Sequence, residues 1–408
     1  MNPLLSTDSY ALGHYLQYPP NMTSSYFYLS HRSPEPIVFF GLQQLLKELR
    51  VPTMKEVHEA AKIAYHHGLP FNQKGFERIS MYEYWPIYIH AIPEGTIVPA
   101  NMPMLTIESD LEPWAPSYLE ALLVQLWYPC TVATKSRRIY QAIKQEMELS
   151  CDTLDGLPYM LHDFGVRGVG SMETAAIGGL AHLTSFEGTD NLPAIELARN
   201  AYSCSMAGKS IMAMNHATCM AWGKENEAAA FIGTAKHGLP ASYITDTYDM
   251  PAALDKCIGL PRNSLIVIRL DSGDPFKTVP YALRRLHRSV PWRLNSKGLI
   301  VFNNHKVLQG DGVDESTIRL ILANARLNGF SADNLVFGMG GELLQKCNRD
   351  THGFNMKLSA VRLDDTWHEV HKEAPGKTSL AGRFNLPAVE PTTLSQIRNL
   401  IESQNRQS

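Results

Sequence analysis

The sequence has no large excess of charge of either sign: 37 Lys and Arg residues face 40 Asp and Glu residues, a formal net charge of -3 over 408 residues. This balance argues against the broad basic surface with which proteins bind nucleic acid, so any functional cations must act locally. Cysteine is also scarce, and the lack of C-x-x-C pairs argues against a disulfide framework or a structural zinc site. The six cysteines are Cys130, Cys151, Cys204, Cys219, Cys257 and Cys347.

Long apolar runs are missing as well. The first ten residues contain no basic region followed by an apolar stretch, which is the pattern of a secretory signal. The most apolar later window, around residues 121–133, is interrupted by Gln125 and Pro129 and does not predict a membrane helix. We therefore expect a soluble, cytoplasmic protein with neither membrane nor nucleic acid as a partner.

Four stretches of the chain share one design, in which a short apolar strand leads into a turn rich in Gly and charged residues and then into a helix. Such turns bring backbone N–H groups and a helix N-terminus towards the strand ends, which favours phosphate binding. The Asp residues in these turns are suited to ribose hydroxyls and to hydrated Mg²⁺. The stretches are Leu161-His-Asp-Phe-Gly-Val-Arg-Gly168, Val267-Ile-Arg-Leu-Asp-Ser-Gly-Asp-Pro275, Val307-Leu-Gln-Gly-Asp-Gly-Val-Asp314 and Leu335-Val-Phe-Gly-Met-Gly-Gly341.

Strands alternate with helices from about Thr153 to Arg349, which predicts βα units around parallel strands. Because residues suited to catalysis follow so many strands, a closed, irregular TIM-like α/β barrel is favoured over an open sheet. We predict this barrel for residues 153–350, and an additional α+β domain built from residues 1–152 and 351–408. The barrel strands are expected near Tyr159, Ala241, Leu265, Lys306 and Leu335, and the tail should end in a helix from Thr393.

Nine groups of residues, in matching order along nearly the whole chain, resemble the motifs of the nicotinamide phosphoribosyltransferase family. No single group would suffice, but nine in register are highly specific. They are Asp8-Ser-Tyr10; Trp127-Tyr-Pro129 with Thr131-Val-Ala-Thr134; His162-Asp-Phe-Gly165; Gly188-Thr-Asp190; Asn215-His-Ala-Thr218 with Ala221-Trp-Gly223; Asp246-Thr-Tyr-Asp249; Arg269-Leu-Asp-Ser-Gly273; Gln309-Gly-Asp-Gly312; and Gly340-Gly341 with Leu343-Leu-Gln-Lys346.

The resemblance implies a type II phosphoribosyltransferase with an irregular α/β barrel, working as a homodimer with active sites shared between subunits. Such enzymes join nicotinamide to 5-phosphoribosyl-1-pyrophosphate (PRPP) in NAD salvage and release nicotinamide mononucleotide and pyrophosphate. The resemblance also implies Mg²⁺ held mainly through pyrophosphate, without a dedicated set of protein ligands, and ATP as an optional co-substrate.

The roles that the resemblance implies agree with the charges of the reaction. Displacement at the ribose C1 carbon develops positive charge on the sugar while pyrophosphate leaves with negative charge, so the protein must hold both groups. Asp246 and Asp271 match family carboxylates near the ribose and metal–pyrophosphate, and Asp311 one that binds ribose hydroxyls. The other implied substrate-binding residues are Arg167 and Arg269 near the ring and ribose, Gly340 and Gly341 around the 5′-phosphate, Ser242 and Gly310, and Arg349, Lys357, Lys372 and Lys377 around the phosphates, partly from the second subunit.

The resemblance gives Phe164 and Tyr10 the task of sandwiching the pyridine ring, with Tyr10 coming from the neighbouring subunit. His216 matches the family histidine that accepts a phosphoryl group from ATP, a reaction of which a neutral imidazole is capable. The chain departs from the family pattern at Asn215, where many members have Glu before this histidine.

Two alternatives remain open. Nicotinate phosphoribosyltransferase has the same fold and chemistry but uses an acid in place of an amide. Asp190 favours the amide, because a carboxylate accepts a hydrogen bond from NH₂ and repels another carboxylate. The second alternative is a non-enzymatic binding protein that keeps the fold. Loss of His216 or of the Asp set would favour it, and all of these residues are present.

Overall fold

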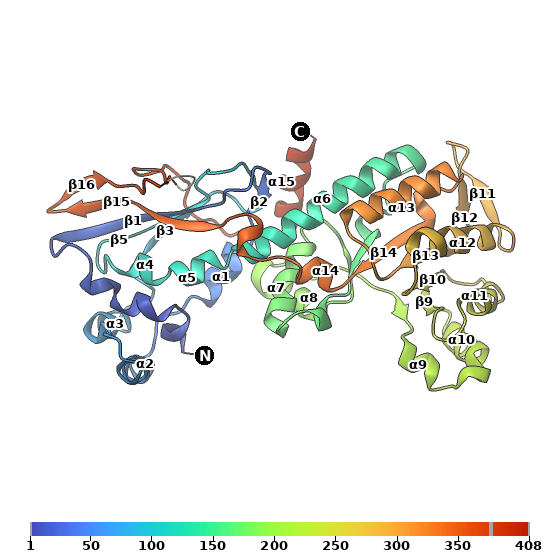
Figure 1. The fold of residues 1–408 in the computed structure, drawn as a ribbon, viewed down its shortest axis with the longest axis horizontal. Coiled ribbons are helices and arrows are strands. Elements are labelled where there is room, and N and C mark those ends of the chain that lie inside the picture. The colour runs from blue at the N-terminus through green and yellow to red at the C-terminus, as the bar shows by residue number, and fades with distance from the viewer. Residues whose placement is uncertain (1, 375–377, 407–408) are drawn as a thin grey trace. The chain divides into compact units, whose positions relative to one another are not determined.

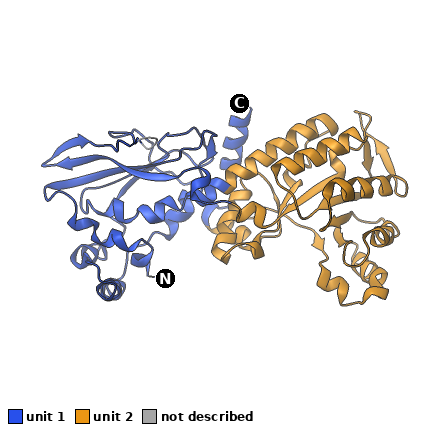
Figure 2. Ribbon diagram, viewed as in Figure 1, with its two compact units in different colours: residues 1–131, 201–203, 347–408 blue, residues 132–200, 204–346 orange. Residues whose placement is uncertain are grey.

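The computed structural model describes residues 2–374 and 378–406, which fall into two compact units (Figure 2). Unit 1 comprises residues 1–131, 201–203 and 347–408, and unit 2 comprises residues 132–200 and 204–346. Among the described residues, no helix is both long and apolar enough to cross a membrane. The functional domain boundaries predicted from the sequence, at residues 152 and 350, stay a prediction.

Unit 1 is built on an antiparallel sheet of five strands in the order β16-β15-β1-β5-β3 (Figure 1). Its long central strand, β1 (Met22–Ser30), pairs with β15 on one side and β5 on the other. The other strands are β2 (Ile37–Val38), β3 (Tyr88–Ala91), β4 (Ile97–Val98), β5 (Leu105–Ser109), β15 (Asn355–Leu363) and β16 (Thr366–Glu369). The helices are α1 (Leu42–Glu48), α2 (Met54–His66), α3 (Gln73–Ile79), α4 (Ala115–Tyr118), α5 (Glu120–Val124) and α15 (Leu394–Asn405).

The sequence did not predict β1, and its burial explains why. Phe27 and Leu29 lie in the main apolar core of the unit, while Tyr26 and Tyr28 on the opposite face are also buried and contact Phe384. A strand covered on both faces lacks the polar alternation by which strands are recognised. By contrast, the predicted helix start at Thr393 is confirmed, because Thr393 caps α15 in a capping box with Gln396.

Unit 2 contains a parallel sheet of seven strands in the order β7-β6-β14-β13-β10-β9-β8. All five predicted strands are present, which confirms an α/β fold; β7 and β8 were missed because each has only two residues. The strands are β6 (Leu161–Asp163), β7 (Gly188–Thr189), β8 (Met212–Ala213), β9 (Ala241–Ile244), β10 (Ile266–Leu270), β13 (His305–Gln309) and β14 (Leu335–Met339), with a separate hairpin of β11 (Trp292–Leu294) and β12 (Ile300–Phe302).

The sheet is curled. A flat sheet with seven strands would separate its edge strands by about 29 Å. Yet the backbone of Lys209 pairs with β7 at one edge, and only three residues later Met212 begins β8 at the other edge, a span of at most about 11 Å. In the described residues β7 and β8 do not pair with each other, so the expected closed barrel is observed as a half-barrel. Two-residue edge strands are too short to form the closing ladder.

Helices surround the curled sheet. The helix α6 (Trp127–Ser150) lies beside α13, and α13 beside α12 (Figure 1), with Arg326 of α13 donating to Glu146 of α6 at 3.0 Å. The other helices are α7 (Met172–His182), α8 (Leu192–Tyr202), α9 (His216–Met220), α10 (Glu227–Ala235), α11 (Met250–Ile258), α12 (Pro275–His287), α13 (Glu315–Leu327) and α14 (Gly341–Leu344).

Candidate active site

The carboxyl ends of all seven parallel strands meet at one edge of the unit 2 sheet, and the predicted residues gather there. This edge is where α/β folds build their active sites. The predicted residues that lie within four positions of a strand end are Phe164 and Arg167 (after β6), Asp190 (β7), His216 (β8), Asp246 (β9), Asp271 (β10), Gly310 and Asp311 (β13), and Gly340 and Gly341 (β14).

Three of these turns share an Asp-x-x-Asp spacing whose two carboxylates differ in role. The second Asp caps the next helix: Asp249, Asp274 and Asp314 accept hydrogen bonds from backbone N–H groups at the starts of α11, α12 and α13. The first Asp precedes the helix, so its carboxylate is not used as a cap. The pairs are Asp246/Asp249, Asp271/Asp274 and Asp311/Asp314. The Asp-x-x-Asp spacing therefore lets the sequence distinguish the carboxylate that caps a helix from the carboxylate that is a candidate for function.

Phe164, Arg269 and Asp271 form one assembly at this edge of the sheet. The guanidinium carbon of Arg269 lies 5.4 Å from the centre of the Phe164 ring. The same guanidinium donates to both carboxylate oxygens of Asp271, with Nη2 at 3.1 Å from each. Both side chains of the ion pair are largely buried, so an aromatic face, a cation and a carboxylate are held in fixed relation.

Two glycines make room for this assembly. A Cβ atom on Gly338 of β14 would lie 2.0 Å from Cε2 of Phe164, and one on Gly310 would lie 2.4 Å from Oδ1 of Asp271. Strand register places these positions on one face, since Arg269 pairs with Leu308, two residues before Gly310, and Gly338 pairs with His162, two residues before Phe164. The glycines are therefore complementary in shape to the candidate substrate-binding side chains.

His216 and Asp246 form a second pair. Asn215 caps α9 by accepting from the backbone N–H of Thr218 at 2.9 Å, and this makes His216 the first residue of the helix. Its Nε2 lies 3.2 Å from Oδ1 of Asp246. About 45% of the His216 side chain is exposed, whereas only 10% of Asp246 is. A buried carboxylate thus orients an imidazole that remains open to a reactant.

Asp190 is exposed, and its Oδ1 accepts a hydrogen bond from the hydroxyl of Ser210. The neighbouring His162 shares the face of Gly188, with which it pairs across β6 and β7. Burial lowers the pKa of His162, and the charge of Asp190 acts in the opposite direction. The carboxylate of Asp190 is therefore bound by Ser210 and lies close enough to His162 to influence it.

The remaining predicted residues of unit 2 show different degrees of burial. Ser242 on β9 is 3% exposed and its hydroxyl has no hydrogen-bond partner among the described residues, which leaves a buried polar group free for a ligand. Arg167 and Asp311 are exposed. Gly341 begins the short helix α14, and its backbone nitrogen packs against Gly168, where a Cβ atom would lie 3.0 Å away.

Asp163 is a buried carboxylate that the sequence did not single out. Its Oδ1 accepts from the backbone N–H of Gly165 at 2.7 Å, and its Oδ2 accepts from the amide of Asn191 at 2.8 Å. Burial raises the pKa of Asp163 to about 6, although both hydrogen bonds act to lower it. These bonds fix the turn that carries Phe164. The sequence signal that could have identified Asp163 is a charged residue within a short strand that is otherwise expected to be buried.

Three of the predicted residues of unit 1, Tyr10, Arg349 and Lys357, lie near one another. Tyr10 is 61% exposed and its ring lies 5.3 Å from that of His14. Burial raises the pKa of Tyr10, and Arg349 acts to lower it. Burial likewise lowers the pKa of Lys357, and Arg349 is among the cations that lower it further. Arg349 is thus close enough to influence both side chains.

We call the charged cluster around Lys357 the cationic patch. It consists of Arg32, Arg349, Lys357 and Lys372, with the half-buried Glu120 as counter-charge. Convergent cations of this kind are suited to phosphate groups. Arg32 and Glu120 were not predicted, because nothing in their local sequence distinguishes them. Lys377, which was predicted, lies outside the described residues.

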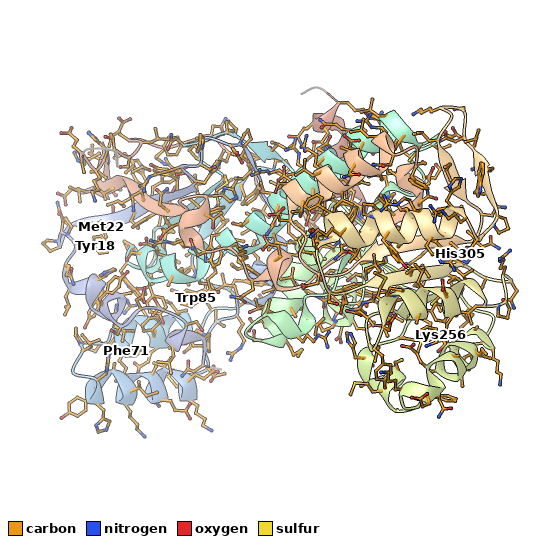
Figure 3. All side chains as sticks on the ribbon, turned by 45° about the vertical axis from the view of Figure 1, so that its right-hand side comes forward. Tyr18, Met22, Phe71, Trp85, Lys256 and His305 are labelled. Carbon is orange, nitrogen blue, oxygen red and sulfur yellow. The ribbon has the colours of Figure 1, made fainter. Side chains whose placement is uncertain are left out.

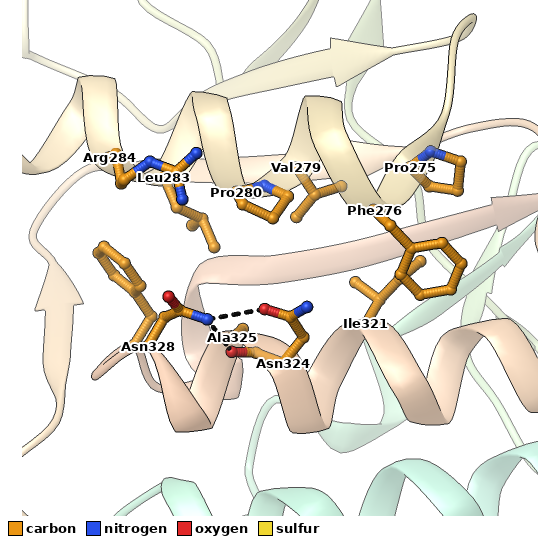
Figure 4. A pocket seen from close by; sticks show the side chains of 11 residues that line it. Pro275, Phe276, Val279, Pro280, Leu283, Arg284, Ile321, Asn324, Ala325 and Asn328 are labelled. Atoms are coloured by element: carbon orange, nitrogen blue, oxygen red, sulfur yellow. Dashed lines mark hydrogen bonds between the residues drawn. The ribbon is translucent and has the colours of Figure 1, made fainter.

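The described residues contain no group of three or more His, Cys, Asp or Glu side chains arranged to hold a metal ion. The carboxylates at the strand ends still offer the oxygen atoms that Mg²⁺ prefers. A groove between α12 and α13 (Figure 4) contains none of the predicted residues; it is lined mainly by apolar side chains, including Phe276, Val279 and Ile321.

The comparisons with known proteins agree with this geometry. The sequence pattern of the nicotinate phosphoribosyltransferase (NAPRTase) family matches residues 159–390, and that of the nicotinamide phosphoribosyltransferase N-terminal domain matches residues 2–84. A nicotinamide phosphoribosyltransferase of Xanthomonas campestris is 42% identical over 94% of this chain and 87% of its own length. The chain belongs to the nicotinate phosphoribosyltransferase family.

More distant relatives extend the match. A nicotinamide phosphoribosyltransferase of Acinetobacter baylyi is 27% identical over 91% of this chain and 85% of its own length. Among solved structures, nicotinate-nucleotide pyrophosphorylase from Pyrococcus furiosus has a TM-score of 0.64 at 17% identity, covering 99% of this chain and 95% of that chain. Human nicotinic acid phosphoribosyltransferase has a TM-score of 0.62 at 17% identity, covering 98% and 93%. At such identities the two structures show a shared fold.

Proposed function

We propose that this protein is a nicotinamide phosphoribosyltransferase, which joins nicotinamide to PRPP and forms nicotinamide mononucleotide and pyrophosphate in NAD salvage. The observation that carries the proposal is the assembly of Phe164, Arg269 and Asp271, in which an aromatic face and a ribose-binding carboxylate are fixed 5.4 Å and 3.1 Å from one guanidinium. This arrangement supports a site in which a pyridine ring would lie beside a ribose. The relative with 42% identity supports the same reaction.

Different residues of the site bind the pyridine ring, the ribose and the 5′-phosphate. Phe164 stacks on the pyridine ring, where aromatic stacking contributes about 0.5–1.5 kcal/mol beyond area burial. Asp271 and Asp311 accept hydrogen bonds from the ribose hydroxyls, and the backbone of Gly340 and Gly341 receives the 5′-phosphate. When the ring nitrogen attacks C1, the new C–N bond forms as the C–O bond to pyrophosphate breaks, and the carboxylates stabilise the positive charge on the sugar.

Mg²⁺ neutralises negative charge on the leaving pyrophosphate when it is bound. If the metal is carried mainly by the pyrophosphate, Asp246 and Asp271 are the side chains that would hold its water ligands. Arg269 remains bound to Asp271 and limits how far this carboxylate can turn towards another partner.

The protein acts as a homodimer in which each site takes Tyr10 and part of the cationic patch from the second subunit. The exposure of Tyr10 supports this, because a ring that is 61% exposed is available to a partner. The half-barrel of unit 2 corresponds to the irregular barrel of the type II phosphoribosyltransferases, with the Lys209 backbone at its narrow edge. The compartment is the cytoplasm.

ATP serves as an optional co-substrate through His216. If Nε2–H donates to Asp246, the proton is fixed on Nε2 and the lone pair of Nδ1 is free to attack. The N–P bond then forms at Nδ1 as the bond between the γ-phosphorus and the β,γ-bridging oxygen breaks, and ADP leaves. The phosphohistidine adds negative charge beside Asp246, and its hydrolysis returns His216 to the neutral imidazole.

The test is incubation of the purified protein with nicotinamide, PRPP and Mg²⁺, with quantification of both products. We expect nicotinamide mononucleotide and pyrophosphate in equal amounts, and far slower turnover when nicotinate replaces nicotinamide. Equal or faster use of nicotinate would support the alternative, a nicotinate phosphoribosyltransferase. Absence of product with either base would contradict the proposal.

A further inference from the structure

The helix that carries His216 has little to hold it in place. Helix α9 has five residues, and the only one of them that is buried is Cys219, which is fully inaccessible. A short helix with one buried side chain gains its position from the contacts of that side chain, because five residues do not form a stable helix alone. The placement of His216 therefore depends on what surrounds Cys219.

The thiol of Cys219 meets a buried carboxylate. Its Sγ lies 3.9 Å from Oε1 of Glu227, the first residue of α10, and Glu227 is only 1% exposed. The other oxygen, Oε2, accepts from Nζ of Lys256 on α11 at 2.6 Å. One carboxylate thus joins three helices, and Figure 3 labels Lys256 where it lies in this part of unit 2.

Both members of the His216–Asp246 pair connect to this carboxylate. Cys219 is one helical turn after His216 and lies against Glu227. On the other side, α11 and Lys256 follow directly from the turn that contains Asp246. Burial raises the pKa of the Cys219 thiol, and Thr247, the residue after Asp246, acts in the opposite direction. The segment that carries His216 and the segment that carries Asp246 are therefore both connected to Glu227.

We propose that Glu227, held by Lys256, is a positioning residue that sets His216 against Asp246 for phosphoryl transfer from ATP. The inference rests on the proposed role of His216. Glu227 and Lys256 do not touch substrate in this account; they act by fixing the two backbone segments that present the imidazole and its carboxylate. A displacement of about 1 Å in such a reactant lowers rates by up to about 100-fold.

The experiment measures two quantities: phosphohistidine formed from ATP, followed by intact mass under alkaline quench, and nicotinamide mononucleotide synthesis with and without ATP. The proteins are wild type, His216→Ala as the blank, Glu227→Met, and the double variant Glu227→Met/Lys256→Met. The double variant removes both charges and so avoids a buried charge without a partner. Glu146→Met/Arg326→Met is the matched control, since this pair at 3.0 Å joins α6 and α13 elsewhere in unit 2.

We expect phosphohistidine formation to fall about 10- to 100-fold in Glu227→Met. The double variant should regain thermal stability without regaining the adduct, while ATP-independent synthesis, which uses Asp246 but not His216, falls less than adduct formation and the KM for nicotinamide stays within about twofold of wild type. The control pair should form the adduct at the wild-type rate. A merely structural role for Glu227 predicts instead that stability and adduct formation recover together, and this result would overturn the inference.

Cys219→Ala tests the same contact from the other side and keeps the test decisive if the Glu227 variants fold poorly. The loss of the thiol should slow adduct formation at least about fivefold, while ATP-independent synthesis continues. Wild-type adduct formation in Cys219→Ala would contradict the positioning role. If wild type itself forms no phosphohistidine, both the proposed ATP coupling and this inference are wrong. If wild type is phosphorylated and the variants are phosphorylated equally well, only this inference is wrong.

Discussion

Unit 2 and unit 1 present their candidate functional residues in opposite ways. In unit 2 these side chains lie mostly at the carboxyl ends of parallel strands, and an apolar run followed by a turn marks most of them in the sequence. In unit 1 they come from two 3₁₀ helices, which carry Tyr10 and Arg349, and from the strand that carries Lys357. A parallel sheet collects residues that share a local pattern, whereas the antiparallel unit collects residues that share none. The candidate residues of unit 2 can therefore be predicted from the sequence pattern, whereas those of unit 1 can be grouped only when the fold is known.

The largest expected effect separates the two carboxylates of one turn in unit 2. Asp271→Ala removes the partner of Arg269 and a ribose contact, so kcat/KM should fall about 10²- to 10³-fold. Asp274→Ala, three residues away, removes the cap of α12 and an exposed ion pair with Lys277, and should cost about 1 kcal/mol of stability with little change in rate. Steady-state kinetics and thermal unfolding of both variants provide the comparison. Similar kinetic losses in the two variants would remove the distinction between the first and second Asp.

The next effect tests whether the units act across subunits. Tyr10→Ala and Asp271→Ala alter different units, so a one-to-one mixture of the two chains should contain mixed dimers with one intact site. Random pairing makes half of the dimers mixed, which predicts recovery of about a quarter of wild-type activity. Asp246→Ala mixed with Asp271→Ala is the control, because both changes lie in unit 2 and leave no intact site. Recovery in the control mixture, or none in the first, would contradict the shared site.

A smaller effect concerns shape complementarity in unit 2. Gly338→Ala places a methyl group 2.0 Å from the present position of the Phe164 ring, which must move. We expect the KM for nicotinamide to rise about tenfold and stability to fall by about 1–3 kcal/mol. Gly170→Ala is the control, because a Cβ atom there meets no neighbour within 4 Å. An unchanged KM in Gly338→Ala would show that Phe164 does not bind the base.

A further effect concerns the pH dependence of stability and not catalysis. The pKa of Asp163 is about 6 in the folded protein, above the value of about 3.9 for an exposed Asp, so the folded state holds this proton more tightly. Its contribution to stability is full below about pH 4 and is lost as the pH rises to about 6, by about 3 kcal/mol in total. Denaturant unfolding of wild type and Asp163→Asn between pH 4 and pH 7 should show this change as a difference between the two proteins. A constant difference across that range would contradict the raised pKa.

Much of unit 2 could be predicted because its strands are short apolar runs followed by Gly and Asp. The pattern indicated β10 and the position of Asp271, and the structure brings Arg269 and Phe164 to the same side. It did not indicate β7 and β8, since two residues show no periodicity. The pattern predicted a closed barrel, but it could not show that the sheet stops at a half-barrel, because this depends on the short edge strands and on the backbone pairing of Lys209 with Gly188.

Unit 1 was less accessible for a different reason. Strand β1 is buried on both faces and lacks alternation, and Arg32 follows it without any local signal. Arg32 and Lys357 come together because β1 and β15 pair over a sequence separation of more than 300 residues. Resemblance to a family supplied Tyr10, Arg349 and Lys357; the physical pattern of the sequence alone would not have done so.

The choice of base tests the central claim most directly, because it asks whether the edge of the unit 2 sheet binds nicotinamide. Asp190 directly follows β7 at this edge and accepts a hydrogen bond from Ser210. Two unit charges about 4 Å apart at an effective dielectric of about 20 interact by about 4 kcal/mol, so nicotinate should be disfavoured several-hundredfold.

The measurement is the ratio of kcat/KM for nicotinamide to that for nicotinate, in wild type and in Asp190→Asn, at identical PRPP and Mg²⁺ concentrations. The account predicts a ratio of about 100 or more in wild type and a fall of at least about tenfold in Asp190→Asn. A wild-type preference for nicotinate, or a ratio that the substitution leaves unchanged, would contradict it.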